Sequence, residues 1–241
     1  MWYLLILYIV ALVGIALRFV ITGQFEWSQF GTCSLFLLGA LIIGAAQRWQ
    51  AKRDLTYKPE QTDLEWNTYL SERYSAEKKM LYKGAEKTAE YRRFYRKWRH
   101  RLVDEIFAGH GKWFMNLSFE WTNGERFAFV EQKGSIFRVN DTWHVVHNEQ
   151  VIAKVKTDYT IKNAIRLQEG IHLEINGKTY YFKSSTISSK TDVFLDEERV
   201  ASGMRSHIMR FQYRFDTAKG NEEIEPLLVM TYILFSYVHR Q

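Results

Sequence analysis

The stretch Pro226-Leu-Leu-Val-Met-Thr-Tyr-Ile-Leu-Phe-Ser-Tyr-Val238 is apolar on every side when it is drawn as a helix. Such a helix must be surrounded by other parts of the protein. It has about a dozen apolar residues, fewer than the roughly 20 that cross a bilayer. Glu225 before it and His239 after it match the two ends of a helix dipole. The sequence therefore predicts a helix buried inside a domain that the preceding residues form.

The residues before this helix alternate between apolar and polar side chains, as strands with one buried face do. In residues 209–215, for example, methionine and aromatic residues alternate with arginine and glutamine. Residues 171–175 and 180–182 flank Asn176-Gly177, which is the strongest short-range hairpin signal. Further short strands are expected at 113–121, 126–131, 135–139, 143–147, 151–156, 159–167, 192–196 and 199–203. Strands at this spacing predict a closed or nearly closed antiparallel barrel or sandwich, with the terminal helix through its centre.

Two apolar runs near the N-terminus predict a transmembrane helical hairpin over residues 1–48. Residues 2–22 are long enough to span a bilayer, and a second run, 30–47, follows a short polar loop. A cleaved signal peptide is the alternative. Against it, no Lys or Arg precedes the first apolar core, and no small-residue cleavage site follows it. Arg18 is expected to reach the membrane interface in the direction of Glu26.

Basic residues decide the expected orientation of this hairpin. The loop 23–29 contains Glu26 and no Lys or Arg, whereas basic residues follow the second run: Arg48, Lys52, Arg53 and Lys58. By the positive-inside rule the loop faces out and everything after residue 48 is cytoplasmic. The expected location is the cell membrane, as a multi-pass protein with a cytoplasmic C-terminal domain.

Residues 49–109 are expected to form a charged, cytoplasmic helical stalk, and residues 110–241 to form the barrel. Between residues 60 and 107 the chain has no proline, and large apolar residues recur at spacings of three, four and seven, as in an amphipathic helix. Gly84 interrupts this pattern and marks a break. The whole chain is thus predicted to be α+β: a helical hairpin, a helical stalk, and a barrel of about 12 strands around a helix.

The run Tyr91-Arg-Arg-Phe-Tyr-Arg-Lys-Trp-Arg-His-Arg101 is the strongest chemical feature. On a helix, its aromatic side chains would gather on one side among basic residues, as in amphipathic helices that lie on anionic lipid. It also suits nucleic-acid phosphates or a solvated helix packed on the barrel, but the hairpin favours lipid over nucleic acid. The candidate lipid-binding residues are Arg92, Arg93, Arg96, Lys97 and Trp98 in this run, with Lys154, Lys156, Lys162 and Arg166 on outward strand faces.

Composition and motifs argue against catalysis. The chain of 241 residues has a net charge of +6, which favours an anionic partner. Cys33 is its single cysteine, so an intramolecular disulfide and a cysteine metal cluster are excluded. His144 and His147 would point to opposite faces of a strand and could not bind one ion without a bulge. No nucleophile elbow, zinc-protease, Walker or kinase motif is present, so no catalytic residue, metal or cofactor is expected.

The order of elements near the C-terminus resembles that of a known superfamily. Residues 193–203, the strand 207–215, the acidic loop 221–225 and the apolar terminal helix are similar to the tubby C-terminal-like superfamily, which includes the phospholipid scramblases. That family is a twelve-stranded barrel around a hydrophobic helix, and the resemblance covers residues 112–241. No part of this sequence matches the cysteine-rich or calcium-binding segments of scramblases.

Tubby proteins of animals bind phosphoinositides and scramblases act at membranes. Together with the predicted hairpin and the missing catalytic motifs, the resemblance implies a bacterial, membrane-anchored and non-catalytic module that binds anionic lipid headgroups. One alternative is a structural or signalling scaffold that recruits a protein partner, or self-associates, through its helical stalk. A third, weaker alternative is a hydrolase or lipid-transforming enzyme with an unrecognised site.

Overall fold

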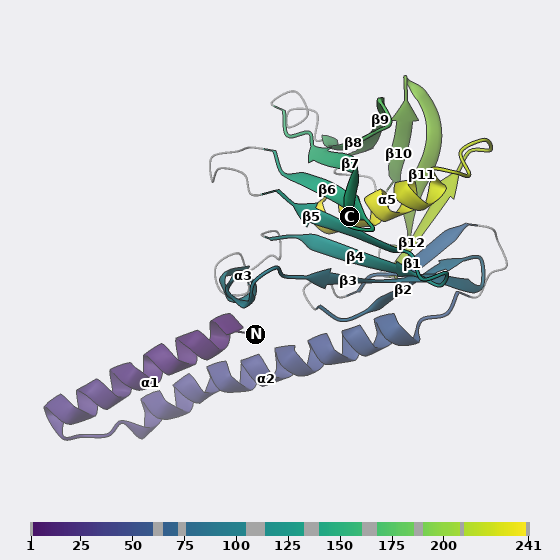
Figure 1. Cartoon of the computed structure of the whole chain (residues 1–241). Helices are drawn as coiled ribbons and strands as arrows, with labels where there is room; N and C mark the ends of the chain where they lie inside the picture. Colours follow the sequence, from purple (N-terminus) through teal and green to yellow (C-terminus); the bar gives the residue numbers. More distant parts are fainter. Residues whose placement is uncertain are drawn as a thin grey trace.

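The computed structural model describes residues 2–59, 65–71, 76–104, 114–132, 140–160, 168–185, 190–207 and 210–239. In these residues it shows two long N-terminal helices, then a closed barrel of twelve antiparallel strands around a C-terminal helix (Figure 1). The predicted α+β class and the arrangement of a barrel around the terminal helix are therefore confirmed.

Each barrel strand pairs with its neighbours in sequence, and the first strand closes the ring against the last. At the closure Trp66 lies opposite Phe215 and Tyr69 lies opposite Gln212. Closure satisfies the strand edges that an open sheet would leave unpaired. The strands are β1 (Trp66–Tyr69), β2 (Lys79–Lys83), β3 (Glu86–Phe94), β4 (Asn116–Trp121), β5 (Arg126–Glu131), β6 (Thr142–His147), β7 (Gln150–Thr157), β8 (Gln168–Ile175), β9 (Lys178–Ser185), β10 (Lys190–Leu195), β11 (Glu198–His207) and β12 (Arg210–Thr217).

The two ends of the barrel differ in their connections. At one end, here called the turn end, Asn148-Glu149, Asn176-Gly177 and Asp196-Glu197 each have two residues with positive φ. This is the geometry of the type I′ turns that join closely paired strands. The predicted hairpin at Asn176-Gly177 is thus confirmed as the β8–β9 turn. At the other end, β3 leads into the short helix α3 (Trp98–Val103).

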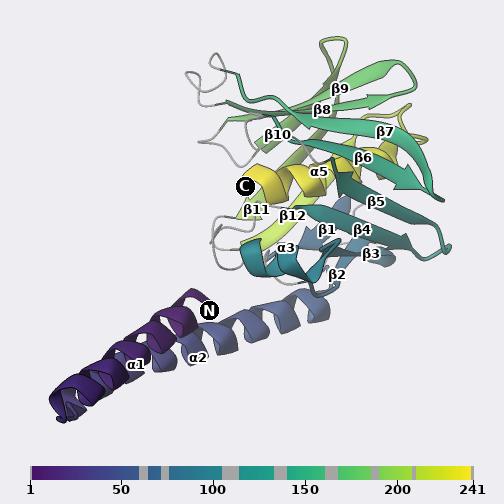
Figure 2. The ribbon, with the colours of Figure 1, turned by 60° about the vertical axis from the view of Figure 1, so that its left-hand side comes forward.

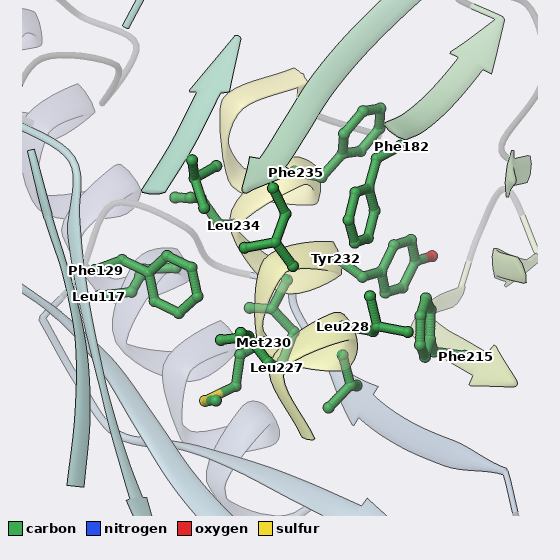
Figure 3. Packing of buried hydrophobic residues seen from close by; sticks show 14 of the residues in the cluster. Leu117, Phe129, Phe182, Phe215, Leu227, Leu228, Met230, Tyr232, Leu234 and Phe235 are labelled. Carbon is green, nitrogen blue, oxygen red and sulfur yellow. The ribbon is translucent and has the colours of Figure 1, made fainter. Parts of the chain in front are cut away.

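The C-terminal helix α5 (Glu225–His239) fills the centre of the barrel (Figures 1 and 2). Leu228 and Leu234 are 0% exposed, although they lie close to the end of the chain. In Figure 3 the side chains of α5 extend toward Leu117 on one wall and toward Phe215 on another. Because these side chains contact walls on several sides, the helix is apolar all round, as its sequence required.

A carboxylate at the start of α5 binds the helix to the turn end. Glu225 accepts hydrogen bonds from Lys83 Nζ and from Thr217 Oγ1, both at 2.6 Å. Burial alone would raise the pKa of Glu225, but its hydrogen bonds and the positive charge of Lys83 together outweigh burial and hold the pKa below the usual value. The negative charge also lies at the positive end of the helix dipole.

The N-terminal helices α1 (Trp2–Thr22) and α2 (Trp27–Thr56) pack against each other as a hairpin. Both are long and apolar enough to cross a membrane. Arg18 forms an ion pair with Glu26 in the connecting loop, as the sequence predicted. Helix α2 extends about two turns beyond the predicted hairpin boundary at residue 48, because its last turns pack on the barrel.

The predicted helical stalk over residues 49–109 is wrong. Strands β1 to β3 lie inside that range, so the barrel begins at Trp66 and not at residue 110. The break predicted at Gly84 is the tight turn between β2 and β3. Lys79 and Arg93 point into the barrel and are 1% and 0% exposed. Because charged residues occupy these two inward positions, the sequence here does not show the apolar–polar alternation by which a strand is recognised. The predicted strand at 135–139 and most of that at 159–167 lie outside the described residues.

Candidate membrane-facing site

The end of α2 is bound to the outside of the barrel through polar contacts. Asp54 is 1% exposed and accepts hydrogen bonds from the backbone N–H of Ser71, at 3.1 Å, and from the Ser71 hydroxyl. The Tyr82 hydroxyl donates to the carbonyl oxygen of Tyr57 at 2.8 Å. Hydrogen bonds from such donors offset part of the cost of burying a carboxylate, which would be costlier still if it were left unpaired. The contacts therefore fix the barrel at one end of the hairpin.

Aromatic side chains mark two levels along the hairpin. Trp27 and Trp49 of α2 are 75% and 60% exposed, and Tyr3 of α1 is exposed as well. At 1.5 Å per residue, Trp27 and Trp49 are about 33 Å apart along the helix. This separation matches the roughly 30 Å hydrocarbon core of a bilayer, at whose interfaces Trp and Tyr are enriched. The side chains between them include exposed apolar residues: Leu35, Leu38, Leu41 and Ile42.

Helix α3 lies beside the N-terminal end of α1 in both ribbon views (Figures 1 and 2). Trp98 at its start is 72% exposed. Arg96, Lys97 and Arg99 are exposed around it, and we call these four residues the α3 surface. Basic side chains around an exposed indole are the composition of an interfacial membrane contact. Helix α3 thus lies on the side of the barrel on which the hairpin lies (Figures 1 and 2).

A buried ion pair holds α3 against the barrel. Arg93 Nη2 donates to Asp104 Oδ2 at 2.7 Å, and the two side chains are 0% and 2% exposed. The Tyr95 hydroxyl donates to the same carboxylate oxygen at 2.9 Å. The prediction that Arg93 faces lipid is therefore wrong. Residues 91–94 belong to strand β3 and not to a helix, so neighbouring side chains alternate: Arg92 points out and Arg93 points in.

Glu131 at the end of β5 lies near this ion pair. Its burial, together with the nearby Asp141 carboxylate, raises the pKa of Glu131 to about 7. Its backbone N–H donates to Asn116 Oδ1 at 2.8 Å. The α3 end of the barrel thus contains a carboxyl group that changes charge near neutral pH.

The other predicted lipid-binding residues do not join the α3 surface. Arg92 is exposed on the outside of β3. Lys154 and Lys156 point outward from β7, which is four strands farther around the ring than β3. There, Lys154 Nζ is 3.8 Å from Glu174 Oε2. Lys162 and Arg166 lie outside the described residues. The structure therefore brings together Arg96, Lys97 and Trp98, with Arg99 added from the same run.

The described residues contain no group of three or more His, Cys, Asp or Glu side chains that could hold a metal ion. His147 is stacked on Phe127, with ring centroids 4.2 Å apart.

No family model matches the chain, and neither a curated protein nor a solved structure matches it.

Proposed function

We propose that the chain is a membrane-anchored, non-catalytic module of tubby-like type that binds anionic lipid headgroups. Helices α1 and α2 cross the cell membrane as a hairpin, with the loop outside and the barrel in the cytoplasm, as the positive-inside rule favours. The α3 surface binds headgroups of the cytoplasmic leaflet. The observation that supports this proposal is that α3, which carries the exposed Trp98 and Arg99 and directly follows the exposed Arg96 and Lys97, lies near the N-terminal end of α1 (Figures 1 and 2).

The energetics support headgroup binding without a deep pocket. Each basic side chain near an anionic leaflet contributes about 1 kcal/mol, so three cations contribute about 3 kcal/mol before screening. The indole of Trp98 adds an amphipathic ring of the kind that settles at the interface. The Arg93–Asp104 ion pair already orders α3, so binding loses little conformational entropy.

The test uses the full chain in nanodiscs of neutral lipid or of neutral lipid mixed with phosphatidylserine, with bromine atoms on the acyl chains as fluorescence quenchers. The difference in emission between the wild type and Trp98→Phe isolates the signal of Trp98. We expect strong quenching of Trp98 in anionic nanodiscs and weak quenching in neutral ones. The triple change Arg96→Gln, Lys97→Gln and Arg99→Gln should remove this difference, and so should high salt.

Changing Lys154 and Lys156 to Gln provides the matched control, because these cations lie on another side of the barrel and should not alter the signal. Equal quenching of Trp98 in neutral and anionic nanodiscs would exclude headgroup binding by the α3 surface. The alternative of a scaffold stays a prediction, but strands β1 to β3 lie where the helical stalk through which it would act was expected.

A further inference from the structure

A groove of about 700 Å³ crosses the outer face of β3, β4, β5 and β6. Arg92, Ser118, Ala128 and Val146 are successive cross-strand partners, so they form one row across the four strands. Small side chains at Ser118 and Ala128 make the floor low, and Val146 makes it apolar. The volume lies in the range of sites that bind a small ligand or a short chain segment.

Most of the charged side chains along the groove already neutralise one another. Lys78 Nζ lies 2.6 Å from Glu90 Oε2. Arg126 Nη2 lies 2.8 Å from Glu120 Oε1. These pairs form walls that offer an incoming ligand little net charge.

Two charged side chains in the groove differ from the rest. Among the residues that the structure describes, Arg92 and Glu149 make no ion pair or side-chain hydrogen bond, and both are exposed. Arg92 lies toward the α3 end of β3, and Glu149 lies in the β6–β7 turn at the opposite end of the barrel. The groove therefore has a free cation at one end, a free carboxylate at the other and an apolar floor between them.

The separation of these two charges can be estimated from strand geometry. The three strand spacings from β3 to β6 amount to about 14 Å, and the three residues from Val146 to Glu149 add at most about 10 Å along the strand. The diagonal is about 17 Å. An extended chain covers this distance with about five residues at 3.3–3.6 Å each.

We propose that this groove binds an extended segment of a partner protein, about five residues long, with an acidic side chain at one end, apolar side chains in the middle and a basic side chain at the other end. The acidic end lies at Arg92 and the basic end lies at Glu149. A lipid anion would fit less well, because its single negative charge leaves its acyl chain against the Glu149 carboxylate. The site is separate from the α3 surface and goes beyond headgroup binding.

The probes are four fluorescent peptides with capped termini, in which the central Leu-Val-Leu is flanked by Asp and Lys, by two Asp, by two Lys, or by Asn and Gln. Binding is measured by fluorescence anisotropy with the full chain in neutral-lipid nanodiscs, so that headgroup charge does not attract the peptides. We expect the wild type to bind the Asp/Lys peptide about fivefold more tightly than each peptide with one mismatched end, as for one exposed ion pair.

Two single changes should switch this preference. Arg92→Glu makes both ends acidic, so the variant should prefer the Lys/Lys peptide. Glu149→Arg makes both ends basic, so the variant should prefer the Asp/Asp peptide. Both positions are exposed, so the fold should be retained, which thermal unfolding verifies. Ala128→Trp fills the floor and should weaken binding of all four peptides, whereas Lys156→Glu, outside the groove, should change none of them.

Absence of saturable binding, or a peptide preference that ignores both Arg92→Glu and Glu149→Arg, would overturn the proposal. A free fatty acid that displaces the Asp/Lys peptide would also overturn the proposal if its own binding is lost in Arg92→Glu but kept in Glu149→Arg. A lipid would then be the occupant of the groove. Neither result depends on Trp98 quenching, so failure here is distinguishable from failure of headgroup binding.

Discussion

Replacing Gly203 by alanine tests how closely α5 packs inside the barrel. Gly203 is buried on the inner face of β11. A Cβ atom added there would lie 2.5 Å from Cζ and 2.9 Å from Cδ2 of Tyr232 on α5. These distances are well inside van der Waals contact, so the ring or the helix must move. Phe215 is stacked on the same ring, with centroids 5.0 Å apart, which limits where the ring can go.

The size of the effect follows from two opposing contributions. Overpacking a core costs about 1–3 kcal/mol, and the upper value applies because Tyr232 is held between β11 and Phe215. Loss of backbone freedom in the unfolded chain gives back about 0.4–1 kcal/mol when glycine becomes alanine. The net destabilisation should be about 2 kcal/mol. In a domain of this size, each kcal/mol lowers Tm by about 2–4 °C.

The assay is thermal unfolding of the full chain in detergent for Gly203→Ala, Tyr232→Leu and the double variant. The smaller leucine side chain at position 232 leaves room for the new methyl group, so the double variant should be more stable than the sum of the single effects implies. A coupling free energy of at least about 0.5 kcal/mol is expected for side chains in contact. Ser202→Ala, the adjacent outward position, is the control. A wild-type Tm for Gly203→Ala, or strictly additive effects, would refute close packing of α5 on β11.

Three further predictions concern the core, the turns and the titration of Glu131. Leu234→Ala at the centre of α5 should cost about 2–5 kcal/mol in urea unfolding, against less than about 0.5 kcal/mol for the exposed control Val151→Ala; equal effects would contradict a core position. Glu197→Gly should stabilise the β10–β11 turn by about 0.5–1 kcal/mol, because Glu197 has φ 71°, and Gly177→Ala should destabilise the β8–β9 turn by a similar amount. Glu131 has a pKa raised from 4.5 to about 7 in the folded state, so the folded protein binds its proton more tightly and stability should fall as pH rises from about 4.5 to 7. The free energy of unfolding should fall by at most about 3 kcal/mol over this pH range. Tm values at pH 5 and pH 8 measure the fall, and Glu131→Gln should remove it. If the fall is unchanged in this variant, another group causes it.

Local sequence signals were sufficient for several parts of the fold. The apolar run 226–238 is too short for a bilayer and has no polar face, so burial inside a domain was the remaining solution, and α5 is in the barrel centre. Asn176-Gly177 specifies its turn because both residues tolerate positive φ. The Arg18–Glu26 pair follows from the length and charge of the hairpin loop. Each of these features depends on interactions within a few residues or on one segment's overall polarity.

Contacts between distant segments decided the rest. Large apolar side chains recur at helical spacing from residue 66 onward, yet β1, β2 and β3 are strands, because the ring closes only when β1 pairs with β12. The basic run 91–101 divides between a strand and a helix, because Arg93 finds its partner Asp104 inside the barrel. The groove likewise exists only because four strands align Arg92, Ser118, Ala128 and Val146 in one row. The period of a sequence shows which side chains of one element share a face, but pairing between elements determines whether a buried charge is neutralised and which faces meet.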